Sequence, residues 1–402
     1  MTNLLVSGVG GTILSVFLAI IILLVMICVH EFGHFIAGRI LGFKINEFAI
    51  GFGPRLFKKK GKKHGTVFSV RAFPLGGFCA FAGEDGPEDD ADETDGGSAA
   101  YGIERAQAAD GATAIKQPDP SHFINKKPWQ RIIVLVAGAT MNYLLALVLI
   151  LIMFFAFGQA CYKMGAVKQE TEPEYAVEYS LQEGDIILGA GGRSVYFATD
   201  LIAALNGKKA GDRITFTVLR GGEKVKTQVT LRADCDFKNS SEVSKIWRAL
   251  GSDTFEGQDG NLYWCVSAEN IRFSFFGTLG RSFAYSFKTA GAIFRVLGEL
   301  LTGNLGLSAV GGPVTTIKVT GEVASQGFQS FLQIAAYIGV NLAVFNLLPI
   351  PALDGSKVIF CLIEWIFRKP VPRKVEAIIH AVGFVLILGF AVLVDILQFT
   401  RC

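Results

Sequence analysis

Charge and paired cysteines are both scarce in this sequence, and each shortage excludes a class of protein. Charged residues make up 18% of the 402 residues and hydrophobic residues 51%, a balance too apolar for a soluble enzyme. The seven cysteines include no C-x-x-C pair, and an odd number cannot all pair within one chain. With a net charge of only +3 and no nucleic-acid-binding motif, we expect no nucleic-acid partner.

The N-terminus also lacks a basic n-region and a small-residue cleavage site. We therefore expect the first apolar segment to be retained as a membrane span rather than removed as a signal peptide. Four segments are apolar enough to cross a bilayer core, which takes about 20 helical residues. They lie at residues 13–37, 132–157, 331–348 and 377–397. The loops after the first and the third are rich in lysine and arginine, so the positive-inside rule puts both loops in the cytoplasm and both termini outside.

The first apolar segment runs into the motif H-E-F-G-H at residues 30–34. On a helix, His30 and His34 share one face, with Glu31 beside them. This is the spacing with which two imidazoles bind one zinc ion while a glutamate acts on the water at the metal. An ionisable group near the centre of a membrane helix costs roughly 2.5–3.5 kcal/mol, so three of them together indicate a function. We predict zinc bound by His30 and His34, with Glu31 as the catalytic base.

The third apolar segment ends in N-L-L-P-I-P-A-L-D-G at residues 346–355. Its two prolines end or distort the helix and free backbone groups close to membrane depth. Asp354 follows at the cytoplasmic end of a segment that crosses from outside to inside. The first segment crosses in the same direction and carries His30 and His34 near its own cytoplasmic end, so Asp354 is expected at their depth. Asp354 is therefore the candidate third ligand, which leaves a fourth position for water.

The chain after the first apolar segment has the alternation of β-strands. Apolar residues alternate at positions 48, 50 and 52, and residues 67–73 are rich in strand formers. Strands directly after a membrane helix suggest a hairpin that dips back into the membrane, where protein must cover its backbone. A hairpin on the cytoplasmic surface is the alternative. Glycines would let another backbone approach, so we assign a substrate-binding strand edge to Phe48, Gly51, Gly76 and Gly77.

Two charged stretches interrupt this first cytoplasmic loop. Lysines cluster at residues 58–63, where the hairpin would turn, and they are either solvated or in contact with anionic membrane lipids. Residues 84–95 include eight acidic residues and no basic one. We interpret residues 84–120 as a disordered cytoplasmic insert.

A long exterior stretch separates the second and third apolar segments. Short strands and turns alternate in it, and G-D-I-I at residues 184–187 resembles the turn of a PDZ domain, so we expect one PDZ-like unit at 163–235 and an extension at 236–280. Further on, apolar residues recur at spacings of four and three, while Arg281, Lys288 and Arg295 recur every seven on the opposite side. This predicts an amphipathic helix at 281–303, lying either on the outer membrane surface or against the PDZ-like unit.

Together these motifs resemble the site-2 protease family of intramembrane zinc metalloproteases, and within it the bacterial regulator of sigma-E protease type with a single PDZ domain. The resemblance rests on H-E-F-G-H, on N-L-L-P-I-P-A-L-D-G and on the PDZ-like unit between them, and it covers nearly the whole chain. It implies His30, His34 and Asp354 as zinc ligands and Glu31 as the catalytic base. It also implies a membrane re-entrant sheet that includes residues 48–52 and 74–78.

The same resemblance extends to three asparagines. Asn341 and Asn346 match positions that hold substrate in the family. The family's G-P-x-x-N in the second span is here G-A-T-M-N, ending at Asn142, with alanine in place of proline. An amide in a membrane span usually forms a helix–helix hydrogen bond, but here Asn142 is a candidate to face the metal and stabilise an oxyanion. The PDZ-like unit departs from the family at Ser180, where glycine is usual.

The fold implied is a polytopic α-helical membrane protein with four transmembrane helices, a membrane re-entrant β-hairpin or sheet and one extracytoplasmic PDZ-like domain. The four helices with their motifs are expected at residues 1–42, 129–158, 328–355 and 374–398, and the re-entrant β region at 43–83. The protein is expected in the bacterial inner (cytoplasmic) membrane, with both termini and the PDZ-like domain outside the cytoplasm.

The activity implied is that of a Zn²⁺-dependent endopeptidase acting in regulated intramembrane proteolysis. Its substrates would be single-span membrane proteins such as anti-sigma factors or remnant signal peptides, and an upstream site-1-type protease would trim them first. A non-enzymatic PDZ scaffold with structural zinc and a metal transporter are the alternatives. The intact Glu31 argues against the scaffold, since a structural zinc needs no base. The few polar residues in the second and fourth spans argue against a transport path.

Overall fold

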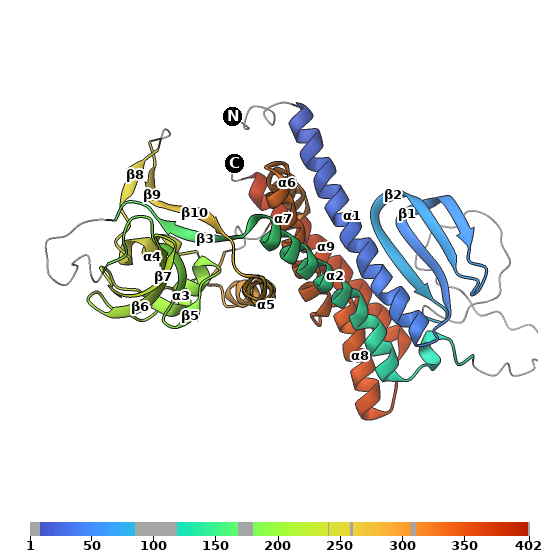
Figure 1. Ribbon diagram of the computed structural model, residues 1–402. Helices are drawn as coiled ribbons and strands as arrows, with labels where there is room; N and C mark the ends of the chain where they lie inside the picture. Colours follow the sequence, from blue (N-terminus) through green and yellow to red (C-terminus); the bar gives the residue numbers. More distant parts are fainter. Residues whose placement is uncertain are drawn as a thin grey trace, which may run out of the picture. The chain divides into compact units, whose positions relative to one another are not determined.

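The computed structural model describes residues 9–84, 119–167, 180–239, 241–257, 260–306 and 311–400 (Figure 1). Most of the insert expected at 84–120 therefore lies outside the described residues. The chain divides into two compact units, Met1–Ala146 with Gly311–Cys402, and Leu147–Val310. Each unit is described by itself, and they are called the helical unit and the sheet unit below.

Within the described residues, four helices are long and apolar enough to cross a membrane. They are α1 (Val9–Ile40), α2 (Pro128–Phe157), α7 (Phe328–Leu347) and α9 (Arg373–Phe399). Their bounds lie within a few residues of those expected from the apolar segments. By length and composition these helices fit the multi-pass membrane protein expected from the sequence, and all of them lie in the helical unit except the last residues of α2, which belong to the sheet unit.

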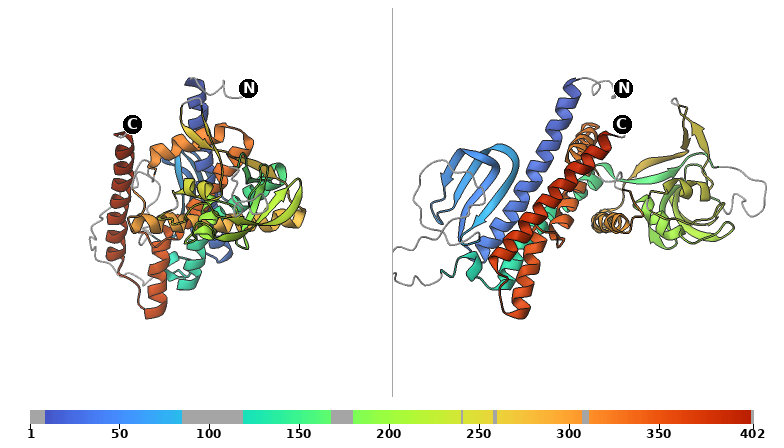
Figure 2. Two further views of the ribbon diagram at one scale, coloured as in Figure 1. Left: turned by 90° about the vertical axis from the view of Figure 1, so that its left-hand side faces the viewer. Right: turned by 180° about the vertical axis from the view of Figure 1, so that it is seen from behind.

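Two shorter helices of the helical unit have no counterpart in the sequence analysis. α6 (Pro313–Ser325) packs on α1 so closely that a Cβ added to Gly321 would lie 2.2 Å from the Ser15 carbonyl oxygen. The Asp395 carboxylate of α9 accepts the backbone N–H of Val314 in the first turn of α6, at 3.1 Å. The second, α8 (Asp354–Phe367), replaces most of the short loop expected between the third and fourth spans. It follows α7 and forms a helical hairpin with α9 (Figure 2).

The expected β-hairpin is present as β1 (Ile45–Lys60) and β2 (Val67–Phe81), and it folds over itself. On one side, residues 47–50 pair with residues 77–80 in the antiparallel sense. On the other side they pair with residues 67–70, and there the residue numbers of both segments increase in the same direction. Residues 55–60 pair with 67–71 beyond. The order of segments is thus 55–60, 67–71, 45–50 and 77–81, which leaves residues 77–81 on an edge.

The inner part of this sheet packs against the helices and the outer part does not. Phe43, Ile45 and Phe81 are buried with Phe123 of the short 3-10 helix η1 (Phe123–Asn125) and Val134 of α2. β1 and β2 lie alongside α1 (Figure 1). By contrast, every residue of β1 from 52 to 60 is exposed, whichever face it points to.

The sheet unit is built on a six-stranded sheet with the order β10-β3-β4-β6-β7 and with β5 paired to β4. The strands are β3 (Gln159–Met164), β4 (Ile186–Ala190), β5 (Arg193–Ser194), β6 (Arg213–Arg220), β7 (Glu223–Thr230) and β10 (Val266–Ile271). Helices α3 (Ala198–Leu205) and α4 (Val243–Ala249) complete its core with side chains such as Leu201, Phe216 and Ile246. A separate ribbon joins β8 (Thr254–Glu256) to β9 (Leu262–Trp264). In the expected G-D turn, Asp185 is fully buried and accepts two hydrogen bonds from Arg220, both at 2.7 Å.

The amphipathic helix α5 (Phe275–Leu301) begins six residues before the expected Arg281, because Ser274 caps it. Its basic side packs on the sheet unit. Arg281 donates to Gln159 at 2.5 Å, and Lys288 forms an ion pair with Asp200. The phenylalanines of its other side are exposed, namely Phe275, Phe276, Phe283, Phe287 and Phe294. α5 thus lies against this unit through its basic side, while most of the surface of its apolar side is exposed.

Candidate metal centre

α1 brings two imidazoles to one point, because residues four apart on a helix lie one above the other. His30 and His34 are both buried, and their rings stand edge to face with centroids 4.7 Å apart. His34 Nδ1 donates to the carbonyl oxygen of Val134 on α2 at 2.8 Å. With the proton on Nδ1, the Nε2 lone pair of His34 is free to bind a metal.

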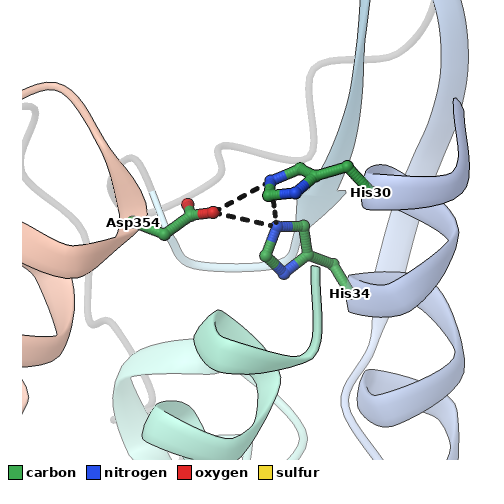
Figure 3. A group of neighbouring side chains, drawn as sticks. All are labelled: His30, His34 and Asp354. Carbon is green, nitrogen blue, oxygen red and sulfur yellow. Dashed lines mark hydrogen bonds and ion pairs between the residues drawn. The ribbon is translucent and has the colours of Figure 1, made fainter. Parts of the chain in front are cut away.

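Asp354 is the first residue of α8 and completes the group (Figure 3). Its Oδ2 lies 2.9 Å from His30 Nε2 and 3.3 Å from His34 Nε2, and the two Nε2 atoms are 3.1 Å apart. Oδ2 and the two Nε2 atoms thus converge on one point, as the ligand atoms of a single metal ion do. The carboxylate also stands at a helix N-terminus, where the helix dipole favours negative charge.

The three ligand atoms fit a zinc ion. Bonds of about 2.0–2.1 Å in a tetrahedral site require ligand atoms about 3.3 Å apart, and the observed separations are 2.9–3.3 Å. Two nitrogens and one carboxylate oxygen are the donor set of a catalytic zinc, with a fourth position left for water or substrate. Among the described residues this is the group of histidine, cysteine and acidic side chains with metal-binding geometry.

α1 and α2 approach each other closely beside the two histidines because each has a glycine there. The sequence analysis did not assign a role to either glycine. A Cβ on Gly138 would lie 2.5 Å from His34 Nε2 and 2.8 Å from His30 Cε1. A Cβ on Gly33 would lie 2.4 Å from the Ala137 carbonyl oxygen. Both distances are far shorter than real Cβ contacts, so a side chain at either position would displace a helix or a ligand. No sequence signal reveals this, because the need for glycine arises from the partner helix.

Glu31 lies between the metal ligands and the edge of the β1–β2 sheet. The backbone N–H of Cys79 in the edge segment 77–81 donates to its carboxylate. A Cβ on Gly77 would lie 3.5 Å from Glu31 Cγ. Of the four residues assigned to a strand edge, Gly77 is thus beside Glu31, the candidate base, and Gly76 adjoins Gly77 in the chain.

The other two members of the expected edge lie elsewhere. The Phe48 ring packs against Phe35 of α1, with centroids 5.5 Å apart. Gly51 has φ +90 and turns the chain where a Cβ would lie 2.7 Å from the Phe73 carbonyl oxygen. The segment that holds Phe48 is paired on both sides. It therefore has no open edge for an added strand, which corrects the assignment of Phe48.

A cavity of about 320 Å³ opens beside the ligands. It is lined by Ile27, His30, Glu31, Asn142, Leu342, Asn346, Ala352, Leu353 and Asp354. Asn142 is fully buried, and neither its amide nitrogen nor its amide oxygen has a hydrogen-bond partner among the described residues. Unpaired buried amides are costly, so a polar group is expected to occupy the cavity next to it.

The two asparagines of α7 differ in their positions. Asn346 lines the cavity, and its Nδ2 lies 3.4 Å from His30 Nδ1. Asn341 is half-buried on α7 and is not among the lining residues. The structure therefore brings Asn142 and Asn346 to the site, and Asn341 only to the same helix.

Known proteins share this sequence pattern over almost its whole length. The pattern of Peptidase family M50 matches residues 18–390. A relative from Nostoc sp., named as a zinc metalloprotease, is 32% identical over 396 residues, which cover 96% of each chain. One from Clostridium perfringens with the same kind of name is 32% identical over 374 residues, covering 92% of this chain and 94% of the relative. The zinc metalloprotease RasP of Geobacillus kaustophilus is 28% identical over 429 residues, covering 94% and 96%.

A class of protein follows from the donor set, the membrane-length helices and these relatives: the chain is a membrane zinc metalloprotease. More narrowly, it belongs to Peptidase family M50, the site-2 protease family. The resemblance to this family drawn from the sequence is thereby confirmed, as is Zn²⁺ as the cofactor. The scaffold and transporter alternatives are set aside.

Proposed function

We propose that this chain is an intramembrane endopeptidase whose zinc ion is held by His30, His34 and Asp354. One observation carries the proposal: the cavity beside these ligands is also lined by Glu31 and by the buried, unpartnered amide of Asn142. A base and a hydrogen-bond donor thus converge with a metal-binding group, on helices of membrane length. Such convergence is what hydrolysis of a peptide bond requires.

In this mechanism zinc supplies Lewis acidity, which lowers the pKa of a water toward 7 and polarises the scissile carbonyl. Glu31 accepts a proton as the water oxygen bonds to the carbonyl carbon. The Asn142 amide donates to the carbonyl oxygen as it gains negative charge. Glu31 then returns the proton to the leaving amide nitrogen as the C–N bond breaks. Asn346 lines the same cavity and is suited to hold the substrate backbone.

The substrate would be a transmembrane helix, whose carbonyls are occupied by i to i+4 hydrogen bonds and must be released before cleavage. Residues 77–81 form an edge of the β1–β2 sheet next to Glu31, and they could hold an unwound segment by strand addition. The exposed apolar side chains of the outer hairpin, Leu56, Phe57 and Phe73, support its insertion into the membrane as a re-entrant element. The lysines at 58–60 in the same strand suit anionic lipid headgroups.

For the remaining parts we propose the topology that lysine and arginine in the loops indicate. Both termini and the sheet unit face the exterior of a bacterial cytoplasmic membrane. The sheet unit is PDZ-like and acts as a gate that excludes bulky substrates until an upstream protease trims them. The Phe155 and Phe275 rings, 5.4 Å apart, join the end of the α2 membrane helix to the start of α5. This contact supports an interfacial position for the apolar side of α5.

Glu31→Gln is the direct test of the chemistry. The purified full-length variant should keep its zinc, because Glu31 is not a ligand, and lose cleavage of a model transmembrane substrate by at least about a hundredfold. Glu223→Gln, at an exposed position of β7, is the matched control and should cleave like wild type. Cleavage by Glu31→Gln at the wild-type rate would sink the proposal.

A further inference from the structure

The loop that precedes Asp354 holds a strained residue. Ala352 has φ +73, in the left-handed region that residues with a Cβ rarely adopt. Ala352 and Leu353 both line the metal cavity, so the strained turn lies directly before the third ligand. A conformation of this kind persists only where neighbouring groups hold it.

A histidine of α9 contacts this turn. His380 Nδ1 accepts the backbone N–H of Ala352 at 2.9 Å. Because Nδ1 accepts, the proton of the neutral ring is on Nε2, which has no hydrogen-bond partner among the described residues and lies 3.8 Å from Glu376 Oε1. The ring also stands edge-on to Phe360 of α8, with centroids 5.7 Å apart. His380 of α9 therefore contacts both the Ala352 turn and α8.

α9 touches the same turn at a second point. A Cβ added to Gly383 would lie 2.1 Å from Pro351 Cβ, so the helix backbone passes directly over the proline. Gly383 follows His380 by three residues and shares its face of the helix. α9 thus holds the loop through the Ala352 amide and through Pro351, although no residue that lines the cavity comes from α9.

We propose that His380 is a positioning residue for the third metal ligand. By accepting the Ala352 N–H, it fixes the left-handed turn that sets the Asp354 carboxylate 2.9 Å from His30 Nε2 and 3.3 Å from His34 Nε2. The inference rests on the proposed ligand set. It makes zinc affinity depend on a helix that supplies no ligand.

Three substitutions in the full-length protein separate this role from simple packing. His380→Phe removes the acceptor and keeps a ring against Phe360. His380→Asn keeps an acceptor, because the asparagine Oδ1 lies close to where the imidazole Nδ1 was. Ala352→Gly relieves the left-handed strain, since glycine adopts positive φ freely, and should make the turn independent of His380.

The readouts are the zinc dissociation constant, measured by competition with a chelator, and the absorption spectrum of the Co²⁺-substituted protein. His380→Phe should weaken zinc about 10- to 100-fold, the usual effect of removing a group that orients a metal ligand, and should alter the Co²⁺ bands. His380→Asn and the double variant His380→Phe/Ala352→Gly should have zinc dissociation constants within about threefold of wild type. The first keeps an acceptor for the Ala352 N–H, and the second removes the strain of the left-handed turn.

Wild-type zinc affinity in His380→Phe would overturn the proposal, and so would His380→Asn binding zinc as weakly as His380→Phe. If His380→Phe does not accumulate in folded form, His380→Asn and the double variant remain as the test. A zinc dissociation constant within about threefold of wild type in both variants would support the proposal, and a larger loss of affinity in either would overturn it. Asp354→Asn is the separate arm for the ligand set itself. Unchanged zinc affinity in Asp354→Asn would refute the assignment of Asp354 as a ligand. Weaker zinc binding in Asp354→Asn with unchanged zinc binding in His380→Phe would refute only the role of His380.

Discussion

The two sides of the metal site are built in opposite ways. On one side α1 is an unbroken helix, in which the spacing of four residues brings His30 and His34 together by local geometry alone. On the other side the chain is interrupted: α7 ends at Leu347, and Asp354 begins α8 after a loop with a strained turn. The proposed ligands His30 and His34 need only a helix to come together, whereas the proposed ligand Asp354 also needs the contacts that hold the loop and α8 in place.

α8 is held by ion pairs as well as by α9. Lys357, one turn after Asp354, donates to Glu84, three residues after β2, with an Nζ–Oε1 distance of 2.6 Å. Nη2 of Arg131, at the start of α2, lies 2.5 Å from Oε2 of Glu364 on α8. The ligand on this side therefore depends on side chains far apart in the sequence. Substitutions far from the metal should therefore weaken zinc binding or cleavage on the α8 side, whereas on the α1 side only substitutions close to the metal should do so.

The largest effect is expected from removing a ligand on the α1 side. His34→Ala loses one of three protein ligands, so zinc should be absent from the purified protein and cleavage should fall below detection. Metal analysis and a cleavage assay check this. His64→Ala, at an exposed position between β1 and β2, is the control and should leave both unchanged. Full zinc occupancy in His34→Ala would mean that α1 does not bind the metal as described.

The next effect tests how closely α2 must approach α1. Gly138→Ala places a Cβ where it would lie 2.5 Å from His34 Nε2. Overpacking of this kind typically costs 1–3 kcal/mol, and here it should also displace a ligand and weaken zinc about tenfold or more. Gly291→Ala on α5, where an added Cβ has nothing within 4 Å, is the matched control and should be neutral or slightly stabilising. Equal zinc affinity in the two variants would contradict the helix contact.

A smaller effect is expected from the ion pair that holds α8. Lys357→Glu and Glu84→Lys each place like charges together and should lower cleavage by about three- to tenfold, in line with the roughly 1 kcal/mol of a partly exposed pair. The double variant restores opposite charges and should recover most of the rate. Full-length protein in detergent at low salt is the suitable sample, since salt screens such pairs. A double variant as slow as the single variants would show that the pair does not position α8.

The smallest effect is expected away from the metal, in the sheet that follows α1. Burial raises the pKa of Glu47, but hydrogen bonds from Arg55, Ser69 and Arg71 outweigh it and leave the pKa below the usual value of 4.5. A lowered carboxyl pKa contributes stability that is present above pH 4.5 and is lost as the pH falls through the folded-state pKa. The thermal midpoint of wild type should therefore drop further below pH 4.5 than that of Glu47→Gln. Parallel pH profiles of the two midpoints would argue against this.

Much of the architecture could be predicted without the structure. The four spans were identified from runs of apolar residues, because membrane length and hydropathy are properties of consecutive residues. Strand alternation likewise predicted β1 and β2. α6 and α8 were missed because neither is long enough to be a span, and both are defined by packing against other helices. The folding of the β1–β2 hairpin over itself was also missed, because it depends on pairing between segments that are separated in the chain. The pairing of Phe48 on both sides was missed with it.

The sequence by itself determined the arrangement of His30, Glu31 and His34 on α1, since a helix fixes their relation through hydrogen bonds between successive turns. It also indicated Asp354, because two segments that cross a membrane in the same direction end at the same depth. Only the tertiary structure decided how Asp354 reaches the histidines. The Ala352 turn before Asp354 is held by His380, and Gly138 lets α2 approach the two histidines; both are contacts between residues far apart in the chain. Spacing along a sequence contains no record of such contacts.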